Sequence, residues 1–193
     1  NEGIYQKIVA AAEVQKGDRV IEVGSGLGTL TQYLLDAGAE VTAIEKDHAL
    51  AEHLKTKFAN QKNVKIVEDD ILKFNPLNTK YLIQDTRYKL IGNIPYYLTS
   101  HLLRTVFENW PMPSKVVLML QKEVAQRICA KPPKMSLLAV SVQYYTRPKI
   151  VSYVSSGNFY PPPDVDSAIV KLAPRVQGIG YSQKSAEIGR WTL

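Results

Sequence analysis

Apolar and polar positions follow two different periods along the chain. Short runs rich in Val, Ile and Leu, such as Arg19-Val-Ile-Glu-Val23, are typical of buried strands. Between such runs, apolar residues recur every three or four positions, as at Ile4, Ile8 and Ala12, which is typical of helices. We expect strands over residues 19–23, 40–45, 64–68, 89–92, 115–120, 150–154 and 168–172. We expect helices over residues 4–12, 29–37, 49–58, 99–108, 121–130 and 137–145, the last of which is ambiguous.

The alternation of strands and helices predicts an α/β fold with a mostly parallel, seven-stranded sheet and flanking helices. The run at 115–120 is almost entirely apolar and should lie near the centre of the sheet. Open sheets of this kind bind ligands beyond the carboxyl ends of their strands. Residues that directly follow the strands are therefore the first candidates for a functional site.

Composition and charge narrow the class of protein. The chain has 193 residues, a formal net charge of +6 and a pI near 9.3. Its length suits one domain, and its charge favours a nucleic-acid partner without requiring one. The single cysteine, Cys129, cannot form an internal disulfide, so we expect a reducing, cytoplasmic setting and no membrane span. The histidines, His48, His53 and His101, have no cysteine partners on their predicted helices, so we expect no metal site.

A glycine-rich turn follows the first predicted strand. The segment Glu22-Val-Gly24-Ser25-Gly26-Leu-Gly28 closes that strand and opens a helix, and its glycines allow a ligand to approach the backbone. Its G-x-G-x-G spacing differs from that of dinucleotide-binding proteins, and a plain turn explains the motif by itself equally well. The sequence has no Gly-Lys-Ser/Thr phosphate loop, which argues against an NTPase.

Acidic residues end the next two strands. Glu45, followed by Lys46, is suited to bind both hydroxyls of a ribose, although a solvated residue or helix cap is the simpler alternative. Asp70 is suited to accept the amino group of an adenine while Ile71 packs on its ring; taken alone, a cap is the commoner role for Asp70. The glycine turn and the two acids together describe a site for S-adenosylmethionine.

The segment Asn93-Ile94-Pro95-Tyr96 follows the fourth strand. The Asn93 side-chain oxygen and the Ile94 carbonyl are suited to accept the two N–H bonds of a base's exocyclic amine. Pro95 restricts the backbone beside that carbonyl, and Tyr96 would stack on an extruded base. A simple strand-to-helix turn is the alternative for this motif by itself.

These motifs, together with Phe159-Tyr-Pro-Pro-Pro-Asp-Val-Asp-Ser167, resemble those of the ribosomal RNA adenine N6-dimethyltransferases. The resemblance runs from residue 1 to about Arg175 and is closest to the type that dimethylates two adjacent adenosines near the 3′ end of 16S rRNA. It implies a Rossmann-like class I methyltransferase fold in residues 1–175, S-adenosylmethionine as cofactor, and a monomer that acts on 16S rRNA in the small subunit. Residues 176–193 form an unassigned tail, and the family's helical C-terminal domain is expected to be absent.

The resemblance also implies a role for each matching residue. The residues expected to bind the cofactor are Glu22, Gly24, Ser25, Gly26, Glu45, Lys46, Asp70, Ile71 and Asn93. The residues expected to hold the target base are Asn93, Ile94, Pro95, Tyr96 and Phe159, with Phe159 stacking opposite Tyr96.

Three other functions remain open from the sequence. An adenine N6-methyltransferase for 23S rRNA, of the macrolide-resistance type, shares the Asn-Ile-Pro-Tyr and Phe-x-Pro-x-Pro motifs. A non-catalytic RNA-binding assembly factor would have no need of the acids Glu22, Glu45 and Asp70. A small-molecule or protein methyltransferase would have no need of two aromatic side chains, Tyr96 and Phe159, around its target.

Two further expectations are that the chain is part of a longer protein and that a basic surface binds RNA. The chain lacks the family's Gln-Asn-Phe-Leu start and has a short connection at 131–135, so we expect a trimmed version of a longer protein. A basic rim near the strand ends, or simply a solvated face, is expected from Lys122, Arg127, Lys131, Lys134, Arg147 and Lys149.

Overall fold

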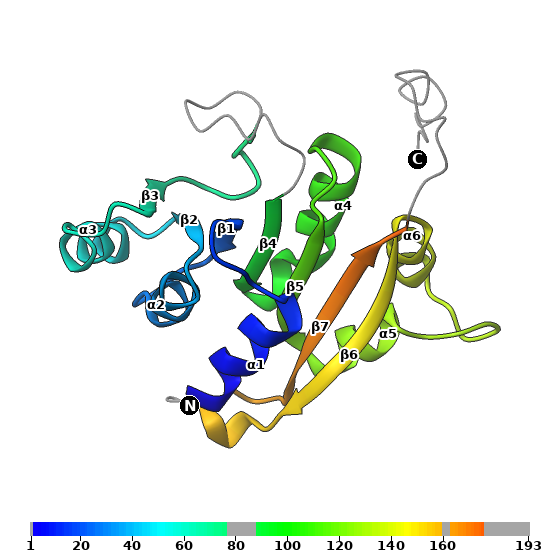
Figure 1. Cartoon of the computed structure of the whole chain (residues 1–193). Coiled ribbons are helices and arrows are strands. Elements are labelled where there is room, and N and C mark those ends of the chain that lie inside the picture. Colours follow the sequence, from blue (N-terminus) through cyan, green and yellow to red (C-terminus); the bar gives the residue numbers. More distant parts are fainter. Residues whose placement is uncertain (1, 77–87, 160–162, 176–193) are drawn as a thin grey trace.

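A seven-stranded sheet forms the centre of the computed structural model, which describes residues 2–76, 88–159 and 163–175. The strand order is β3-β2-β1-β4-β5-β7-β6 (Figure 1). The strands are β1 (Arg19–Val23), β2 (Glu40–Glu45), β3 (Val64–Glu68), β4 (Tyr88–Asn93), β5 (Lys115–Gln121), β6 (Thr146–Val154) and β7 (Ser167–Pro174). Strand β7 runs antiparallel to both β5 and β6, and the other described strand pairs are parallel, so the prediction of a mostly parallel seven-stranded sheet is confirmed.

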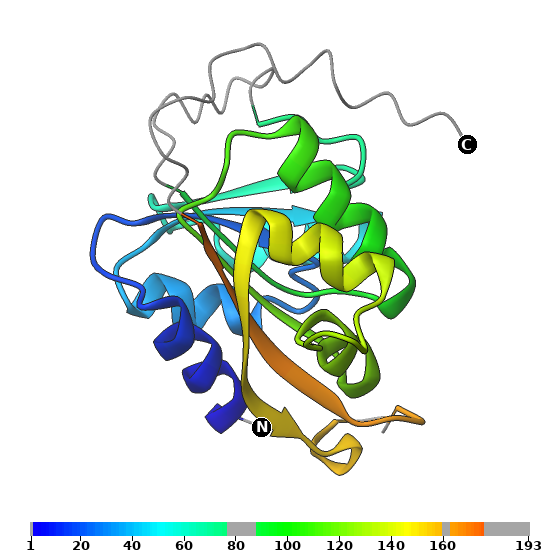
Figure 2. The same cartoon turned by 90° about the vertical axis from the view of Figure 1, so that its right-hand side faces the viewer.

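Helices cover both faces of this sheet. The helices are α1 (Glu2–Ala12), α2 (Thr29–Asp36), α3 (His48–Lys57), α4 (Thr99–Asn109), α5 (Lys122–Ile128) and α6 (Leu137–Tyr145). Two short 3-10 turns are η1 (Tyr96–Leu98) and η2 (Ser156–Asn158). Figure 2 shows α1 and α2 on one side of the sheet and α4, α5 and α6 on the other.

The period of two along each strand divides the core between these faces. In β5, Val116, Leu118 and Leu120 pack with α4, α5 and α6, whereas Val117 and Met119 pack with α1 and α2. All five side chains are at most 1% exposed. This burial on both faces explains why the predicted central strand is continuously apolar.

The late strands are longer than the sequence pattern predicts. Helix α6 confirms the favoured interpretation of 137–145, but β6 begins directly after it, at Thr146. The buried Thr146 hydroxyl donates to the carbonyl of Val142 at 2.8 Å, which satisfies the end of the helix as the backbone becomes extended. Pro148 is tolerated early in β6 because β6 lies at the edge of the sheet.

Ion pairs fasten the end of α1 to the amino ends of the strands. Glu13, just after the helix, pairs with Lys115 of β5 at 2.6 Å and with Lys171 of β7. Hydrogen bonds from both lysines lower the pKa of Glu13 to about 2. Lys89 of β4 bonds the carbonyl of Glu13 and the carboxylate of Asp18, each at 2.6 Å. Helix α1 therefore starts near the carboxyl edge of the sheet and ends near its amino edge.

The remaining expectations concern membrane-spanning helices and the tail at 176–193. Within the described residues, no helix combines the length and apolar character needed to cross a bilayer. The tail predicted at 176–193 lies outside the described residues and stays a prediction, as does the domain assignment of 1–175.

Candidate active site

The first four parallel strands end at one edge of the sheet and bring the predicted motifs together. Strand β1 lies between β2 and β4, with Val23 paired to Ile44 on one side and to Gly92 on the other. The glycine turn after β1 therefore lies beside both Glu45 and Asn93. A Cβ built on Gly24 would be 3.2 Å from the Asn93 carbonyl oxygen, so the glycine turn and the base-binding motif approach each other closely at this point.

The glycine turn joins β1 to α2 in a conformation that few other residues adopt. Gly24, Gly26 and Gly28 have φ values of 69°, 54° and 75°. The amide of Gly24 donates to the Ile44 carbonyl at 3.0 Å, which ties the turn to β2. At Gly28 a Cβ would lie 2.6 Å from the Leu54 side chain, so helix α3 also requires a glycine there.

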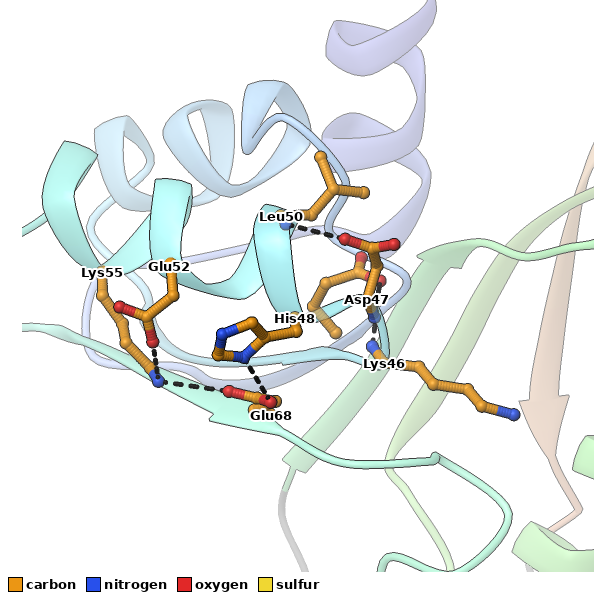
Figure 3. Close-up of polar contacts among 8 residues, drawn as sticks. Lys46, Asp47, His48, Leu50, Glu52, Lys55 and Glu68 are labelled. Carbon is orange, nitrogen blue, oxygen red and sulfur yellow. Dashed lines mark hydrogen bonds and ion pairs between the residues drawn. The ribbon is translucent and has the colours of Figure 1, made fainter.

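Glu45 supports this turn directly. One of its carboxylate oxygens accepts the amide of Gly26 at 2.9 Å. The other accepts the amides of Lys46 at 2.9 Å and Asp47 at 3.0 Å. Asp47 then caps α3 by accepting the amide of Leu50 at 2.9 Å (Figure 3). Glu45, only 8% exposed, is thus a structural anchor as well as the predicted ribose acid, a role that its sequence position did not reveal.

Glu22 is the most deeply buried acid of the site. It is 1% exposed, and one carboxylate oxygen accepts the Thr31 hydroxyl at 2.7 Å. Its other oxygen lies near the hydroxyl of the buried Ser25, and among the described residues neither atom makes a hydrogen bond of standard geometry. Burial and the nearby charge of Glu45 raise the pKa of Glu22 to about 8. Buried polar atoms without partners fit a ligand that brings donors or positive charge.

Thr31 was missed by the sequence reasoning. It is fully buried in the first turn of α2, and its hydroxyl fixes the Glu22 carboxylate. Its place in the turn after the glycine motif, next to a buried acid, is the signal that could have found it.

Asp70 and Lys46, two of the residues expected to bind the cofactor, form an ion pair. The Lys46 ammonium is 2.9 Å from one Asp70 oxygen, and the other oxygen accepts the Leu72 amide at 3.1 Å. These bonds, that from Lys46 first, lower the pKa of Asp70. Asp70 therefore stabilises the turn that follows it by accepting the Leu72 amide, which is the capping role given above as the commoner alternative. Ile71 is 6% exposed and belongs to the core, so only a small part of it is open to a ligand.

The base-binding motif begins at the end of β4. Asn93 is exposed at that end, Ile94 is only 2% exposed and anchors the segment in the core, and Pro95 is exposed. The Pro95 carbonyl accepts the Leu98 amide at 3.0 Å, which forms the turn η1 that Tyr96 opens. Tyr97, which the sequence reasoning did not select, is 81% exposed beside it.

Phe159 follows η2, beyond the carboxyl end of β6. It is partly buried and packs against the core cluster that contains Val154 and the helices α1 and α2. Asp166 holds this region by accepting the Ser156 amide at 3.1 Å and by pairing with Lys122 at 3.4 Å. Phe159 therefore lies at the expected edge, whereas Tyr160, Pro161 and Pro162 of its motif lie outside the described residues.

A surface cluster beside the site contains groups able to bind a metal. The donor atoms of His48, Glu52 and Glu68 lie within 4.8 Å of one another. His48 contacts Glu68 at 2.8 Å, and Lys55 contacts Glu52 at 2.7 Å and Glu68 at 3.4 Å (Figure 3). All these side chains are substantially exposed, and the Lys55 ammonium already pairs with both carboxylates. The cluster forms an ion-pair network, and our expectation of no metal stays a prediction.

The prediction of a basic rim near the carboxyl ends of the strands is wrong for Arg147 and Lys149. Lys122 lies at the carboxyl edge, where it pairs with Asp166 and lies over the Tyr153 ring at 5.7 Å. Arg147 and Lys149 lie near the opposite, amino edge, because Thr146 pairs with Pro174 at the far end of β7. The direction of β6 separates them from Lys122, and closeness in sequence misled the prediction.

Comparisons with known proteins agree with this geometry. The family model for ribosomal RNA adenine dimethylase matches residues 1–188. A ribosomal RNA small subunit methyltransferase A from Dehalococcoides mccartyi (strain CBDB1) is 48% identical over 172 residues, which make up 89% of this chain and 58% of that protein. The chain thus spans about three fifths of the length of the curated relatives it matches.

Two solved structures extend the comparison to the fold. A dimethyladenosine transferase from Plasmodium falciparum is 32% identical, with a TM-score of 0.79, over 91% of this chain and 62% of that one. The 23S rRNA methyltransferase ErmE is 29% identical, with a TM-score of 0.80, over 92% of this chain and 69% of that one. The fold is therefore the Rossmann-like fold of S-adenosylmethionine-dependent methyltransferases. The chain belongs to the ribosomal RNA adenine dimethylase family.

Proposed function

We propose that the protein to which this chain belongs transfers methyl groups from S-adenosylmethionine to N6 of two adjacent adenosines near the 3′ end of 16S rRNA. It would do so as a cytoplasmic monomer during maturation of the small ribosomal subunit. The observation that carries this proposal is the close approach of the glycine turn to the base-binding motif, where Gly24 leaves little room for a side chain beside the Asn93 carbonyl. The name of the curated relatives, small subunit methyltransferase A, supports the choice of substrate.

The residues of the glycine turn fit the proposed cofactor. The free oxygen of Glu22 and the hydroxyl of Ser25 are buried acceptors that would suit the ammonium group of the cofactor's methionine part. Glu45 would accept the ribose hydroxyls and Asp70 the adenine amino group, while Lys46 stays paired with Asp70. When bound, S-adenosylmethionine supplies an electrophilic methyl group.

The residues after β4 would prepare the nucleophile. The N6 lone pair of adenine is delocalised into the ring, which makes the amine weakly nucleophilic. Hydrogen bonds from this amine to the Asn93 side chain and the Ile94 carbonyl would favour a tetrahedral nitrogen and aim its lone pair. Tyr96 and Phe159 would hold the extruded base between them. Most of the acceleration would then come from positioning and electrostatics.

The testing experiment supplies labelled S-adenosylmethionine to small subunits that lack this modification and, separately, to large-subunit RNA. The products are digested and N6,N6-dimethyladenosine is measured by mass spectrometry. We expect label in the small subunit only, and the Asn93→Ala variant provides the background.

The alternatives give different results in the same assay. Label in the large-subunit RNA alone would assign the chain to the 23S type, which the fold similarity to ErmE keeps as the second candidate. Cofactor binding without label in either RNA would favour the non-catalytic assembly factor or would mean that this chain lacks the parts that select RNA.

A further inference from the structure

A hollow lies between α1 and the last two strands, away from the candidate active site. Its volume is about 400 Å³. Figure 2 shows α1 beside β6 along this side of the molecule. The lining residues are Ala10, Ala11, Glu13, Arg147, Pro148, Lys149, Val151, Lys171 and Ala173. We call this hollow the α1–β6 groove.

The cations of the α1–β6 groove share one face of the sheet. Lys149 pairs with Lys171 across the strands, and Arg147, two residues before Lys149, points to the same side. Ile169, two residues before Lys171, belongs to the core cluster that includes α1. The three cationic side chains therefore lie on the α1 face, beside small alanines that leave the groove open.

Positive charge in the α1–β6 groove is incompletely balanced. Lys171 pairs with Glu13, which also binds Lys115. The side chains of Arg147 and Lys149 are exposed and, within the part of the chain that the structure describes, make no hydrogen bond or ion pair. Two exposed cations without partners beside a third favour a partner with regularly spaced negative charges.

From the α1–β6 groove, α1 and β6 run side by side toward the carboxyl edge of the sheet, where the candidate active site lies. Further along α1, the Lys7 ammonium reaches the Ser152 hydroxyl of β6 at 3.4 Å. Strand β6 then ends with Val154 paired to Ser167, which itself pairs with Gln121 at the carboxyl end of β5. Phe159 follows shortly after, so an extended polyanion in this groove would lead to the edge where the target base is expected.

We propose that the α1–β6 groove binds the phosphate backbone of ribosomal RNA that flanks the target adenosines. This inference rests on the proposed function and adds to it a second contact surface, distinct from the expected rim at Lys122. Phosphate contacts position a nucleic acid without reading its sequence, as exposed arginine and lysine side chains would do here.

The test compares charge-reversed variants of the full 193-residue chain. RNA affinity is measured by fluorescence anisotropy on a small-subunit rRNA fragment over a salt series. For Arg147→Glu/Lys149→Glu we expect at least about tenfold weaker binding near 0.1 M salt. The slope of log affinity against log salt should fall by about 1–2, since each lost phosphate contact contributes roughly 0.7–0.9.

The matched control is Lys16→Glu/Lys62→Glu, which makes the same change in net charge at two exposed lysines outside the groove. It should change affinity less than about threefold, a limit set by nonspecific electrostatics alone. Calorimetry with S-adenosylmethionine should give wild-type affinity for both variants, which shows that the fold and cofactor site are intact.

The outcomes separate this inference from the proposed function. Equal losses in both variants, or wild-type affinity and salt slope for Arg147→Glu/Lys149→Glu, would overturn the groove proposal even if the wild type methylates small subunits. A third variant, Lys131→Glu/Lys134→Glu, changes two exposed lysines of the expected basic rim. A loss of RNA affinity in this variant alone would also overturn the groove proposal and would assign RNA binding to the other side of the sheet. Groove-dependent RNA binding without methylation would support the groove and would favour the non-catalytic assembly factor over the proposed activity.

Discussion

The amide of Gly26 donates to the carboxylate of Glu45 at 2.9 Å, across nineteen residues of sequence. This bond couples the shape of the glycine turn to the acid that ends β2. The same carboxylate also holds the amides of Lys46 and Asp47. Any change at Glu45 should therefore act on the cofactor site twice, through the loss of a ribose acceptor and through the release of the turn.

We predict that Glu45→Ala weakens S-adenosylmethionine binding by roughly 1–3 kcal/mol, or about 5- to 150-fold. Glu45→Gln should lose less, because it keeps one oxygen acceptor. Isothermal titration calorimetry measures both, with Glu40→Ala at the exposed start of the same strand as control. Wild-type affinity in Glu45→Ala would contradict the role.

For the base-binding motif, we predict that Asn93→Ala lowers the methylation rate by about 100-fold or more, a much larger factor than its effect on cofactor affinity. The reason is that Asn93 would contact the reacting amine and is exposed at the end of β4. Single-turnover methylation with labelled cofactor measures the rate, and Asn109→Ala at the exposed end of α4 is the control. Unchanged turnover in Asn93→Ala would exclude the proposed contact.

Phe159 has two roles, packing against the core and stacking on the target base, which one substitution can separate. Phe159→Leu keeps an apolar side chain against the core but removes the aromatic face. We expect the free energy of unfolding to fall by less than about 1.5 kcal/mol and methylation at saturating cofactor to fall about tenfold, in line with about 1–3 kcal/mol per stacked base. Denaturant unfolding and the methylation assay give the two values. Equal activity would mean that another side chain holds the base.

Strands β1 and β4 approach each other closely at Gly92, so a side chain there should destabilise the protein. A Cβ on Gly92 would lie 2.6 Å from the Val23 carbonyl oxygen, and backbone in adjacent strands has little freedom to move. We predict that Gly92→Ala lowers the free energy of unfolding by about 2–3 kcal/mol. Gly157→Ala, where the nearest atom is 3.9 Å away, should stay within about 1 kcal/mol. Urea unfolding followed by circular dichroism compares them.

Glu22 predicts how stability depends on pH. Its pKa is raised to about 8 in the folded protein from an ordinary value of 4.5. Below pH 4.5 the carboxyl is protonated in both states and burial costs nothing extra. Between pH 4.5 and 8 only the unfolded chain ionises, so stability falls as pH rises, by roughly 3–5 kcal/mol if the whole shift applies.

The measurement is the melting temperature of wild type and Glu22→Gln from pH 5 to 8.5. The wild type should lose stability relative to Glu22→Gln as pH rises, because glutamine cannot ionise. Glu40→Gln, at an exposed site, should follow the wild type. Parallel curves for wild type and Glu22→Gln would mean that the buried carboxyl is ionised in the folded state at neutral pH.

Local pattern was sufficient for most of the fold. The strand at Arg19–Val23 and the strand expected at 115–120, which ends one residue later at Gln121, were found because apolar runs of that length leave few alternatives. The early part of β6 was missed because Thr146 serves both as the end of α6 and as the start of the strand. That double role depends on a contact within the folded chain.

The sequence by itself determined the α/β class, the order of the strand-end motifs and the family resemblance, since these depend on residue types and spacing. Only the tertiary structure decided that Glu45 anchors the glycine turn, that Lys46 pairs with Asp70, and that Arg147 and Lys149 lie away from Lys122. Each of these depends on which strands become neighbours and in which direction they run. Pairing across the sheet joins residues far apart in sequence, and hydrophobic periodicity specifies a strand's faces but not its partner.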